Sequence, residues 1–245
     1  MLIKAAINGG RSPADHPAVP VSPEEQAAAV VKCLAAGANA IHLHVRGTNS
    51  GKVDFGKESL FAADIARTLS AVRETSPRAL IGVSTGAWIL AGRERLQAIS
   101  AWEVPPDFAS VNFSESGAAE LTKLFLSRGV GVEAGLIDSD SAHALVVSGL
   151  TSECLRLLLE PQEQEMSAAL QTVRAMEDVL SEAGRLPPLL LHGTEATTWD
   201  MMSEAISRGY EIRIGLEDTL VLPDGTVAAD NVALINEALR RVASA

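Results

Sequence analysis

The sequence is poor in cysteine, in basic residues and in long apolar runs. Only two cysteines occur among 245 residues, Cys33 and Cys154, in unrelated segments, so we expect neither a disulfide framework nor a cysteine metal site. Lys and Arg number 20 against 31 Asp and Glu, and the net charge of −11 disfavours nucleic acid or an anionic membrane as a partner. No apolar stretch approaches the ~20 residues that cross a bilayer, and we expect no signal peptide. These absences predict a soluble, cytoplasmic protein with reduced cysteines.

What the sequence does contain is a series of short apolar runs. Most of them lack polar alternation, which is typical of parallel strands buried on both faces. The expected strands are Leu2–Asn8, Ala40–Val45, Leu80–Thr85, Phe108–Phe113, Gly131–Ile137, Cys154–Glu160, Pro188–His192 and Glu211–Glu217.

Helical patterns fill the intervals between the expected strands. Ser22-Pro23-Glu24-Glu25 is a capping box with proline at the first helical position, and this helix closes at Gly37. Eight βα units of about 30 residues each predict a single (β/α)8 TIM barrel over residues 1–245, with a doubly wound open sheet as the alternative. The other expected helices are Lys57–Ser76, Arg93–Trp102, Gly117–Arg128, a weaker Ser139–Gly149, Glu163–Ala183, Thr197–Arg208 and Asn231–Val242.

Two histidines one residue apart end the second apolar run. Alternate side chains of a β-strand point to the same face, so His42 and His44 project together. Closure of a barrel would bring the last strand, which ends in Glu217, to the same mouth. Two imidazoles and a carboxylate suit Zn²⁺ with open coordination positions, and Fe²⁺ or another divalent metal also fits. The alternative is that both histidines belong to the core and bind backbone carbonyls.

Polar side chains also end several of the other expected strands. Inward polar residues in a barrel otherwise filled by Val, Ile and Leu need a partner, so together they favour a ligand site, although each alone could be structural. Arg213 shares a face with Glu217, and an arginine near Glu217 and Asp218 would hold both carboxylates ionised. Arg46 either receives an anionic substrate or faces solvent. The further candidates for substrate contact are Asn8, Arg11, Ser84, Thr85, Gly86, Ser110, Asn112, Glu133 and His192.

Five stretches of the chain match the motifs of a known family in the same order. They are AVPVSPEE (18–25), IHLHVR (41–46), VSTG (83–86), ASVNF (109–113) and RIGLED (213–218). Through these motifs, which span nearly the whole chain, the sequence resembles the β-keto acid cleavage enzymes, typified by 3-keto-5-aminohexanoate cleavage enzyme. The resemblance implies a TIM barrel, usually a homo-tetramer, that binds zinc through His42, His44 and Glu217.

The resemblance also implies a reaction. The family converts a β-keto acid and acetyl-CoA into acetoacetate and a new acyl-CoA. Asp218, paired with Arg213, would be the catalytic base, and Ser84 and Ser110 would contact the substrate or the activated carbonyl. A Lewis-acidic metal would stabilise the enolate formed at the α-carbon, and the carbanion would attack the thioester before a retro-Claisen step.

Departures from the family pattern bear on the substrates. Arg11 stands where many members carry an acidic residue, which predicts a neutral or anionic keto acid, and Gly47 stands where Asp or Glu is usual. After the sixth strand the chain continues as Leu159–Glu163 (LEPQE) in place of a glycine-rich loop on the side where CoA would bind. Two alternatives therefore stay open: a metal-dependent lyase or aldolase that does not use CoA, and a non-catalytic barrel that binds a small molecule or a protein partner.

Overall fold

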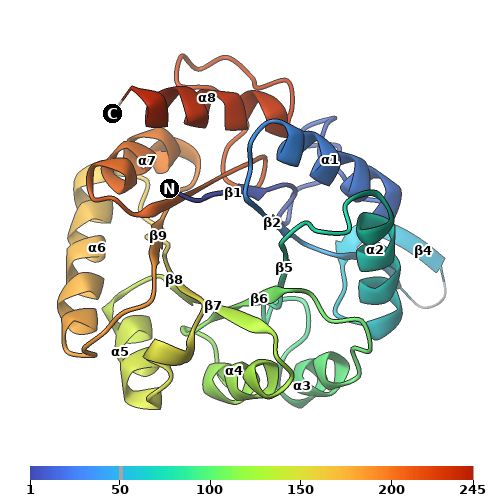
Figure 1. The fold of residues 1–245 in the computed structure, drawn as a ribbon, viewed down its shortest axis with the longest axis horizontal. Helices are drawn as coiled ribbons and strands as arrows, with labels where there is room; N and C mark the ends of the chain where they lie inside the picture. Colours follow the sequence, from blue (N-terminus) through green and yellow to red (C-terminus); the bar gives the residue numbers. More distant parts are fainter. Residues whose placement is uncertain (50–51, 245) are drawn as a thin grey trace. The chain divides into compact units, whose positions relative to one another are not determined.

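The computed structural model describes residues 1–49 and 52–244, in which strands and helices alternate along the chain (Figure 1). The strands are β1 (Ile3–Ala6), β2 (Ala40–Leu43), β3 (Arg46–Asn49), β4 (Lys52–Glu58), β5 (Ile81–Ser84), β6 (Phe108–Asn112), β7 (Gly131–Leu136), β8 (Arg156–Leu159), β9 (Leu189–Leu191) and β10 (Glu211–Ile214). The helices are α1 (Pro23–Ala35), α2 (Ala62–Thr75), α3 (Gly92–Ser100), α4 (Ala118–Ser127), α5 (Ser139–Ser148), α6 (Met166–Ser181), α7 (Thr198–Ser207) and α8 (Asn231–Ala243).

Within the described residues, the eight strands other than β3 and β4 follow the closed order β1-β10-β9-β8-β7-β6-β5-β2. This order is that of a (β/α)8 barrel, so the predicted TIM barrel is confirmed and the open-sheet alternative is wrong. Every residue of β2, β5 and β8 is buried, as expected for parallel strands covered on both faces. The apolar runs of the sequence therefore became strands because each had two faces to bury.

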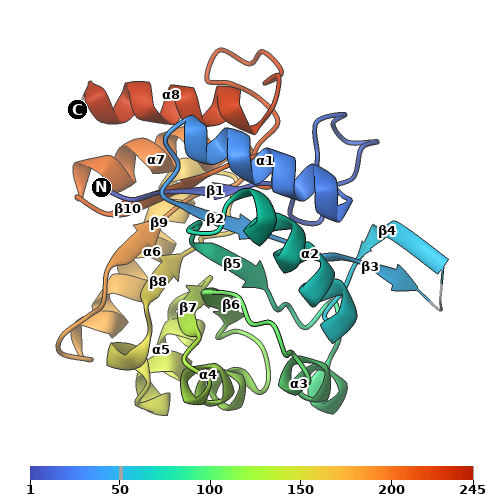
Figure 2. The same cartoon turned by 45° about the vertical axis from the view of Figure 1, so that its right-hand side comes forward.

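The chain divides into two compact units. The first unit comprises Leu2–Asp107 and Ile214–Ser244, and the second comprises Phe108–Arg213. In the first unit β1 pairs with β2, and β2 with β5, all parallel. Figures 1 and 2 both show α1 lying beside α2 and beside α8. The antiparallel strands β3 and β4 project past the end of β2 in Figure 2, and β3 begins two residues after His44.

Helix α1 begins as the sequence predicts. The hydroxyl of Ser22 accepts a hydrogen bond from the backbone N–H of Glu25, the Glu25 carboxylate accepts one from the backbone N–H of Ser22, and Pro23 occupies the first turn. These bonds satisfy N–H groups that have no partner inside the helix. The helix buries Val30 and Cys33.

In the second unit, parallel strands pair in sequence order, β6 with β7, β7 with β8 and β8 with β9, and the first residues of β10 pair with β9. Helices α4, α5 and α6 lie on the outside of these strands (Figure 1). The register places Ser110 opposite Glu133, and Glu133 opposite Arg156. Polar side chains from three neighbouring strands are therefore brought close to one another.

One predicted boundary is wrong, the start of the helix expected at Lys57–Ser76. The structure continues β4 to Glu58, and α2 begins only at Ala62. The Ser59 hydroxyl donates to Asp64 at 2.7 Å and accepts a hydrogen bond from the backbone N–H of Phe61 at 3.2 Å. These local bonds involve the residues between β4 and α2. Serine and aspartate side chains that bond locally in this way compete with helical backbone bonds, so the helix begins later than the pattern predicts.

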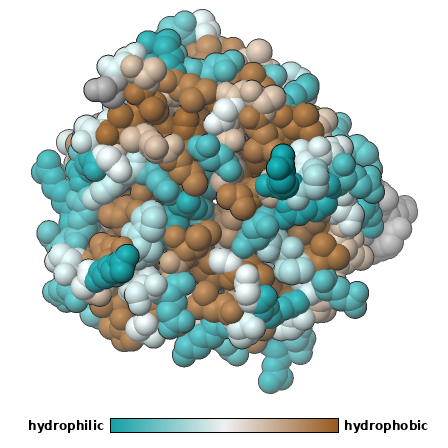
Figure 3. Space-filling model, viewed as in Figure 1, coloured by the Kyte–Doolittle hydropathy of each residue, from teal (hydrophilic) through white to brown (hydrophobic). Residues whose placement is uncertain are grey.

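Exposed large apolar side chains are spread over many elements. Figure 3 shows hydrophobic and hydrophilic residues interspersed on one face of the molecule. In the part of the chain that the structure describes, no helix has the length and apolar character needed to cross a bilayer. The large apolar residues with exposed side chains are Met1, Val31, Phe61, Leu80, Trp88, Val104, Val147, Leu155 and Val227.

Candidate functional site

The first unit brings together the two histidines and the glutamate that the sequence predicted as metal ligands. His42 lies in β2, His44 follows β2, and Glu217 follows β10. Nε2 of His42 is 3.7 Å from one carboxylate oxygen of Glu217, and Nε2 of His44 is 3.4 Å from the other. One potential ligand atom from each residue lies within 4.8 Å of the others. The cluster therefore offers two imidazole nitrogens and a carboxylate to a single cation.

The backbone around Glu217 is held by β1 and by the start of α8. The N–H of Glu217 donates to the Ala6 carbonyl at 3.2 Å, and the N–H of Leu216 donates to the Asn231 side chain at 2.8 Å. Gly9 has a φ of +53°, and a Cβ at this position would lie 2.4 Å from Cγ of Glu217. Glycine is required here both by the backbone and by the side chain that packs on it.

Asn8 fixes the backbone of His44. The Asn8 amide nitrogen donates to the His44 carbonyl at 2.9 Å and to the Pro20 carbonyl at 3.1 Å, and the His44 N–H donates to the Asn8 oxygen at 2.9 Å. These bonds join the end of β1 to the end of β2 through one buried side chain. They position a proposed metal ligand, and the contact predicted between Asn8 and substrate stays a prediction.

Glu58, which none of the sequence motifs indicated, contacts His44 from the end of β4. One Glu58 oxygen hydrogen-bonds Nδ1 of His44, and the other accepts a hydrogen bond from Nε1 of Trp88 at 2.5 Å. The Trp88 ring stacks on His44 with centroids 6.3 Å apart and 25° between the planes. Glu58 was hidden because the pattern of residues 57–76 predicted a helix instead of a strand ending beside the histidines.

The carboxylates around His44 favour positive charge at this residue. Burial disfavours the imidazolium, but Glu217 and then Glu58 outweigh it and raise the pKa of His44 to about 9. Burial also opposes ionisation of Glu58, yet its hydrogen bond to His44 and the nearby Trp88 and Arg46 hold the pKa of Glu58 below its ordinary value. A cation bound at His44 would supply the positive charge that both carboxylates stabilise.

Arg46 is buried and binds the first loop. Its guanidinium donates to the Gly9 carbonyl and, at 2.7 Å, to the Arg11 carbonyl. Only 2% of Arg46 is exposed, and burial lowers its pKa. The alternative that Arg46 faces solvent is therefore wrong, whereas its predicted contact with an anionic substrate, like that of the half-buried Arg11, stays a prediction.

Four more predicted site residues lie in the first unit. Ser84 is the last residue of β5, and Thr85 and Gly86 follow it. The side chains of Ser84 and Thr85 are buried. Asp218 is completely buried, and its backbone N–H donates to the Gly215 carbonyl at 2.9 Å in the turn after β10. The predicted role of Asp218 as a catalytic base stays a prediction.

A second polar group occupies the second unit. Nε2 of His192, just after β9, is 3.1 Å from a carboxylate oxygen of Glu160, just after β8. The same oxygen is 4.0 Å from the guanidinium of Arg213 in β10. Glu160 therefore lies between the predicted substrate residue His192 and the predicted partner of the base, Arg213. It is the first residue after β8 in the segment that departs from the family pattern.

Glu133, another predicted substrate residue, is paired with an arginine inside the protein. It is completely buried in β7 and forms an ion pair with Arg156, whose guanidinium also contacts Glu211. These contacts give Glu133 a charged partner within the protein, and its predicted substrate contact stays a prediction. Ser110 and Asn112 are both half-buried on one face of β6, and Asn112 donates to Glu115 at 3.0 Å.

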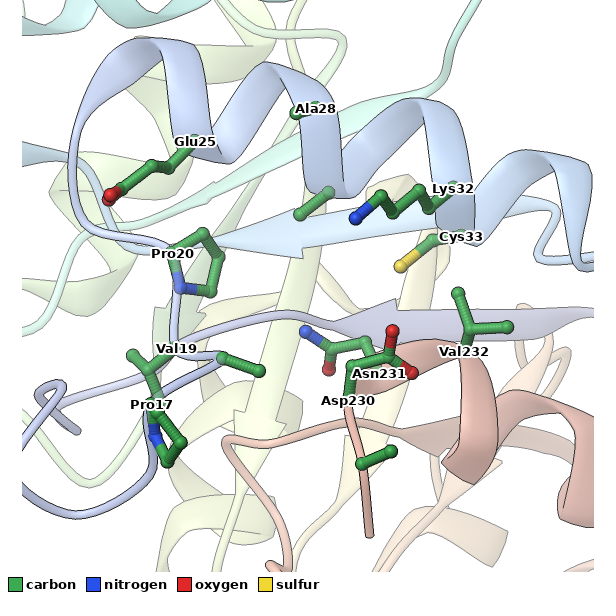
Figure 4. Close-up of a pocket in the computed structure, with 13 residues that line it drawn as sticks. Pro17, Val19, Pro20, Glu25, Ala28, Lys32, Cys33, Asp230, Asn231 and Val232 are labelled. Carbon is green, nitrogen blue, oxygen red and sulfur yellow. The ribbon is translucent and has the colours of Figure 1, made fainter.

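A pocket of about 320 Å³ lies in the first unit between α1 and the start of α8 (Figure 4). Lys32 and Cys33 on α1 lie across from Asp230 and Asn231. Burial, and then the charge of Asp230, raise the pKa of the Cys33 thiol to about 12, so this cysteine is unreactive at neutral pH. Among the described residues that line the pocket, none is a predicted site residue.

The comparison with known families decides what kind of protein this is. The model of the beta-keto acid cleavage enzyme family matches residues 1–245. The chain belongs to the β-keto acid cleavage enzyme family. The resemblance that the motifs indicated is thereby confirmed, and the His42, His44 and Glu217 cluster lies in a member of that family.

Individual relatives cover nearly the whole chain. It is 25% identical to the 3-keto-5-aminohexanoate cleavage enzyme of Fusobacterium nucleatum subsp. nucleatum, over 98% of this chain and 90% of the relative. It is 28% identical to the 3-oxoadipate:acetyl-CoA acetyltransferase of Cupriavidus necator, over 96% of this chain and 86% of the relative. The solved apo structure of ObcA matches with a TM-score of 0.73 and 15% identity, covering 93% of this chain and 62% of ObcA. The chain thus spans less than two thirds of ObcA, and this likeness shows the fold alone.

Proposed function

We propose that the protein cleaves a β-keto acid with acetyl-CoA, giving acetoacetate and a new acyl-CoA by a Claisen and retro-Claisen route. The observation that carries the proposal is the cluster of His42, His44 and Glu217 in a chain that belongs to the β-keto acid cleavage enzymes. A relative named for transfer from acetyl-CoA supports the second substrate. The homo-tetramer and the cytoplasmic location stay predictions.

A divalent metal fits the cluster by the chemistry of its donors. Two imidazoles and one carboxylate are the donor set of many catalytic zinc sites, and Fe²⁺ accepts the same set. The three ligand atoms lie close enough to meet one ion, and both histidines are buried. We propose Zn²⁺ at this site, held by His42, His44 and Glu217. When bound, the metal supplies Lewis acidity that polarises the keto and carboxylate oxygens of the substrate.

The residues around the cluster would bind the substrate and move a proton. Asp218 would remove the proton from the α-carbon of the keto acid, and Arg213 would keep that carboxylate ionised. Ser84 and Ser110 would contact the substrate or its activated carbonyl. The α-carbon would then attack the acetyl thioester with release of the CoA thiolate. The thiolate would add to the original keto carbonyl, the bond from this carbon to the α-carbon would break, and the acetoacetate enolate would take back the proton from Asp218. The further contacts proposed to substrate are those of Asn8, Arg11, Arg46, Thr85, Gly86, Asn112, Glu133 and His192.

Arg11 directs the choice of keto acid. A cationic side chain in the first loop disfavours a substrate that carries an ammonium group and favours one with a carboxylate. We propose that 3-oxoadipate, the substrate named for the Cupriavidus necator relative, is used better than 3-keto-5-aminohexanoate, the substrate named for the Fusobacterium nucleatum relative. Both relatives are similar in identity to this chain, so overall similarity does not choose between them.

One observation favours a second candidate, a metal-dependent lyase or aldolase that does not use CoA. The loop after β8 begins with Glu160, whose carboxylate contacts His192 and lies near Arg213. A carboxylate at this position adds negative charge where a CoA phosphate would need positive charge. The non-catalytic barrel is the third candidate, and membership of an enzyme family counts against it.

The test is to incubate the zinc-supplemented protein with each keto acid, with and without acetyl-CoA, and to measure acetoacetate and acyl-CoA. We expect both products only when acetyl-CoA is present, and more from 3-oxoadipate. The D218N variant should retain metal and lose roughly 10²–10⁴-fold in turnover, the range typical of a general base. Cleavage that proceeds equally well without acetyl-CoA would favour the lyase, and unchanged turnover of D218N would show that Asp218 is not the base.

A further inference from the structure

Glu58 contacts the ring nitrogen of His44 that faces away from Glu217. It hydrogen-bonds Nδ1 of His44, while Nε2 of His44 faces Glu217. The Glu58 side chain is only 10% exposed. Its second oxygen accepts the N–H of Trp88 at 2.5 Å. Glu58 therefore joins two side chains that are far apart in sequence.

The hydrogen-bond chemistry of this group permits one arrangement of protons on neutral His44. An ionised carboxylate only accepts hydrogen bonds, and the indole N–H of Trp88 only donates. Both oxygens of Glu58 therefore act as acceptors, so Nδ1 of His44 carries the proton. The lone pair of the neutral imidazole then lies on Nε2, the nitrogen that points toward Glu217.

The structure also keeps Trp88 in position over this contact. Its ring stacks on the His44 ring, and a Cβ on Gly86 would lie 2.3 Å from the Trp88 ring. Glycine at position 86 thus leaves the space that the indole fills. Although Trp88 is 60% exposed, it is held by the stacking on one side and by its hydrogen bond to Glu58 on the other.

We propose that Glu58 is a positioning residue for the metal. It fixes the tautomer and ring orientation of His44 so that Nε2 is presented to the ion, and Trp88 holds the Glu58 carboxylate in place. Carboxylates that accept the outer N–H of a ligating histidine raise the basicity of the ligand and set its direction. The inference rests on the proposed metal site, but it concerns residues that the family motifs of this chain do not include.

The E58Q variant, which replaces the carboxylate with a carboxamide, separates the positioning role of Glu58 from its contribution to packing. In E58Q the side chain keeps its shape but has one acceptor oxygen for two donors, so its NH₂ group must face either His44 or Trp88. We expect the affinity for Zn²⁺, measured on the full chain by competition with a chromophoric chelator, to fall roughly 10–100-fold. The matched control is E94Q, which makes the same change at an exposed residue of α3 and should leave the affinity unchanged.

The double variant W88F/E58Q tests the tautomer directly. Phenylalanine removes the indole N–H, so the glutamine oxygen is free to accept from His44 and its NH₂ group no longer opposes a donor. We expect E58Q to cost much less zinc affinity in the W88F background than in the wild type. If E58Q alone does not fold, the zinc affinities of W88F/E58Q and W88F still test the role of Glu58.

The outcomes distinguish this inference from the proposed function. Wild-type zinc affinity in E58Q, or an equal loss with and without Trp88, overturns the positioning role and leaves the metal site standing. A wild-type protein that takes up no zinc overturns the metal site and the positioning role together. Weakened binding in E58Q with recovery in W88F/E58Q supports both.

Discussion

Two carboxylates, one in each unit, have opposite surroundings. Glu133 is fully buried and paired with Arg156, which also contacts Glu211. Glu217 is 15% exposed and faces the imidazoles of His42 and His44. Arginine is charged at every physiological pH, whereas a histidine is charged only when it binds a proton. Glu133 is therefore neutralised by the protein itself, while Glu217 lies where a bound cation can complete the charge balance.

A structural ion group and a binding site differ in the partners of their carboxylates. Both carboxylates come from strands or strand ends, and both looked alike in the sequence as polar residues in apolar runs. The type of partner distinguishes them. An arginine balances the carboxylate charge permanently, whereas a histidine can lose its proton or bind a metal ion, so the charge beside the carboxylate can change.

Removing Arg156 should produce the largest loss of stability. In R156L two carboxylates lose their shared cation, and breaking a buried pair in this way costs about 3–5 kcal/mol of the free energy of unfolding. Urea unfolding followed by circular dichroism measures the loss, and zinc affinity of the folded variant should not change. The control is R240L, which breaks an exposed pair with Glu237 and should have a far smaller effect. Equal losses in the two variants would contradict the structural role of Arg156.

Substituting Gly9 should affect both stability and metal binding. In G9A the new Cβ lies against Glu217, and the φ of +53° disfavours alanine, so we expect about 1–3 kcal/mol of destabilisation. Zinc affinity should fall as well, because the methyl group displaces a proposed ligand. The control is G225A, which has a φ of +84° and no atom within 4 Å of its Cβ, so it isolates the backbone effect. If G9A and G225A bind zinc equally well, Gly9 does not position Glu217.

Tyr210, the single tyrosine of the chain, reports on a third carboxylate. Its hydroxyl donates to Glu177 at 2.7 Å, and burial together with this partner raises the pKa of Tyr210 from 10.0 to about 12. Because the folded-state pKa is raised, this contribution to stability is complete below pH 10 and is lost as the pH rises toward 12. Absorbance of tyrosinate against pH should show the raised midpoint, and E177Q should lower it. A midpoint that E177Q leaves unchanged would contradict the assigned cause.

Much of the fold could be predicted because it depends on local pattern. Apolar runs without polar alternation gave the eight barrel strands, and the capping box gave the start of α1. The approach of Glu217 to His42 and His44 also followed, since the ends of parallel strands meet at one side of a barrel. These inferences needed only strand periodicity and the closure of the sheet.

The contacts of Glu58 and Glu160 could not be predicted, because neither depends on local pattern. Glu58 reaches His44 only because β4 continues to Glu58 and pairs with β3, whereas the sequence pattern predicted a helix from Lys57 onward. Glu160 reaches His192 across 32 residues, through loops whose course periodicity does not determine. Side-chain partners of this kind are set by tertiary packing of irregular segments.

The most direct test of the account is the metal content of the purified protein, measured by mass spectrometry beside an H42A/H44A variant. We expect about one zinc ion per chain, as for a single three-ligand site, and its loss in the variant. The variant should remain folded by circular dichroism, so that the loss is assigned to the ligands. No metal in either protein after zinc is supplied, or equal metal in both, would contradict the assignment of His42, His44 and Glu217 as a metal centre.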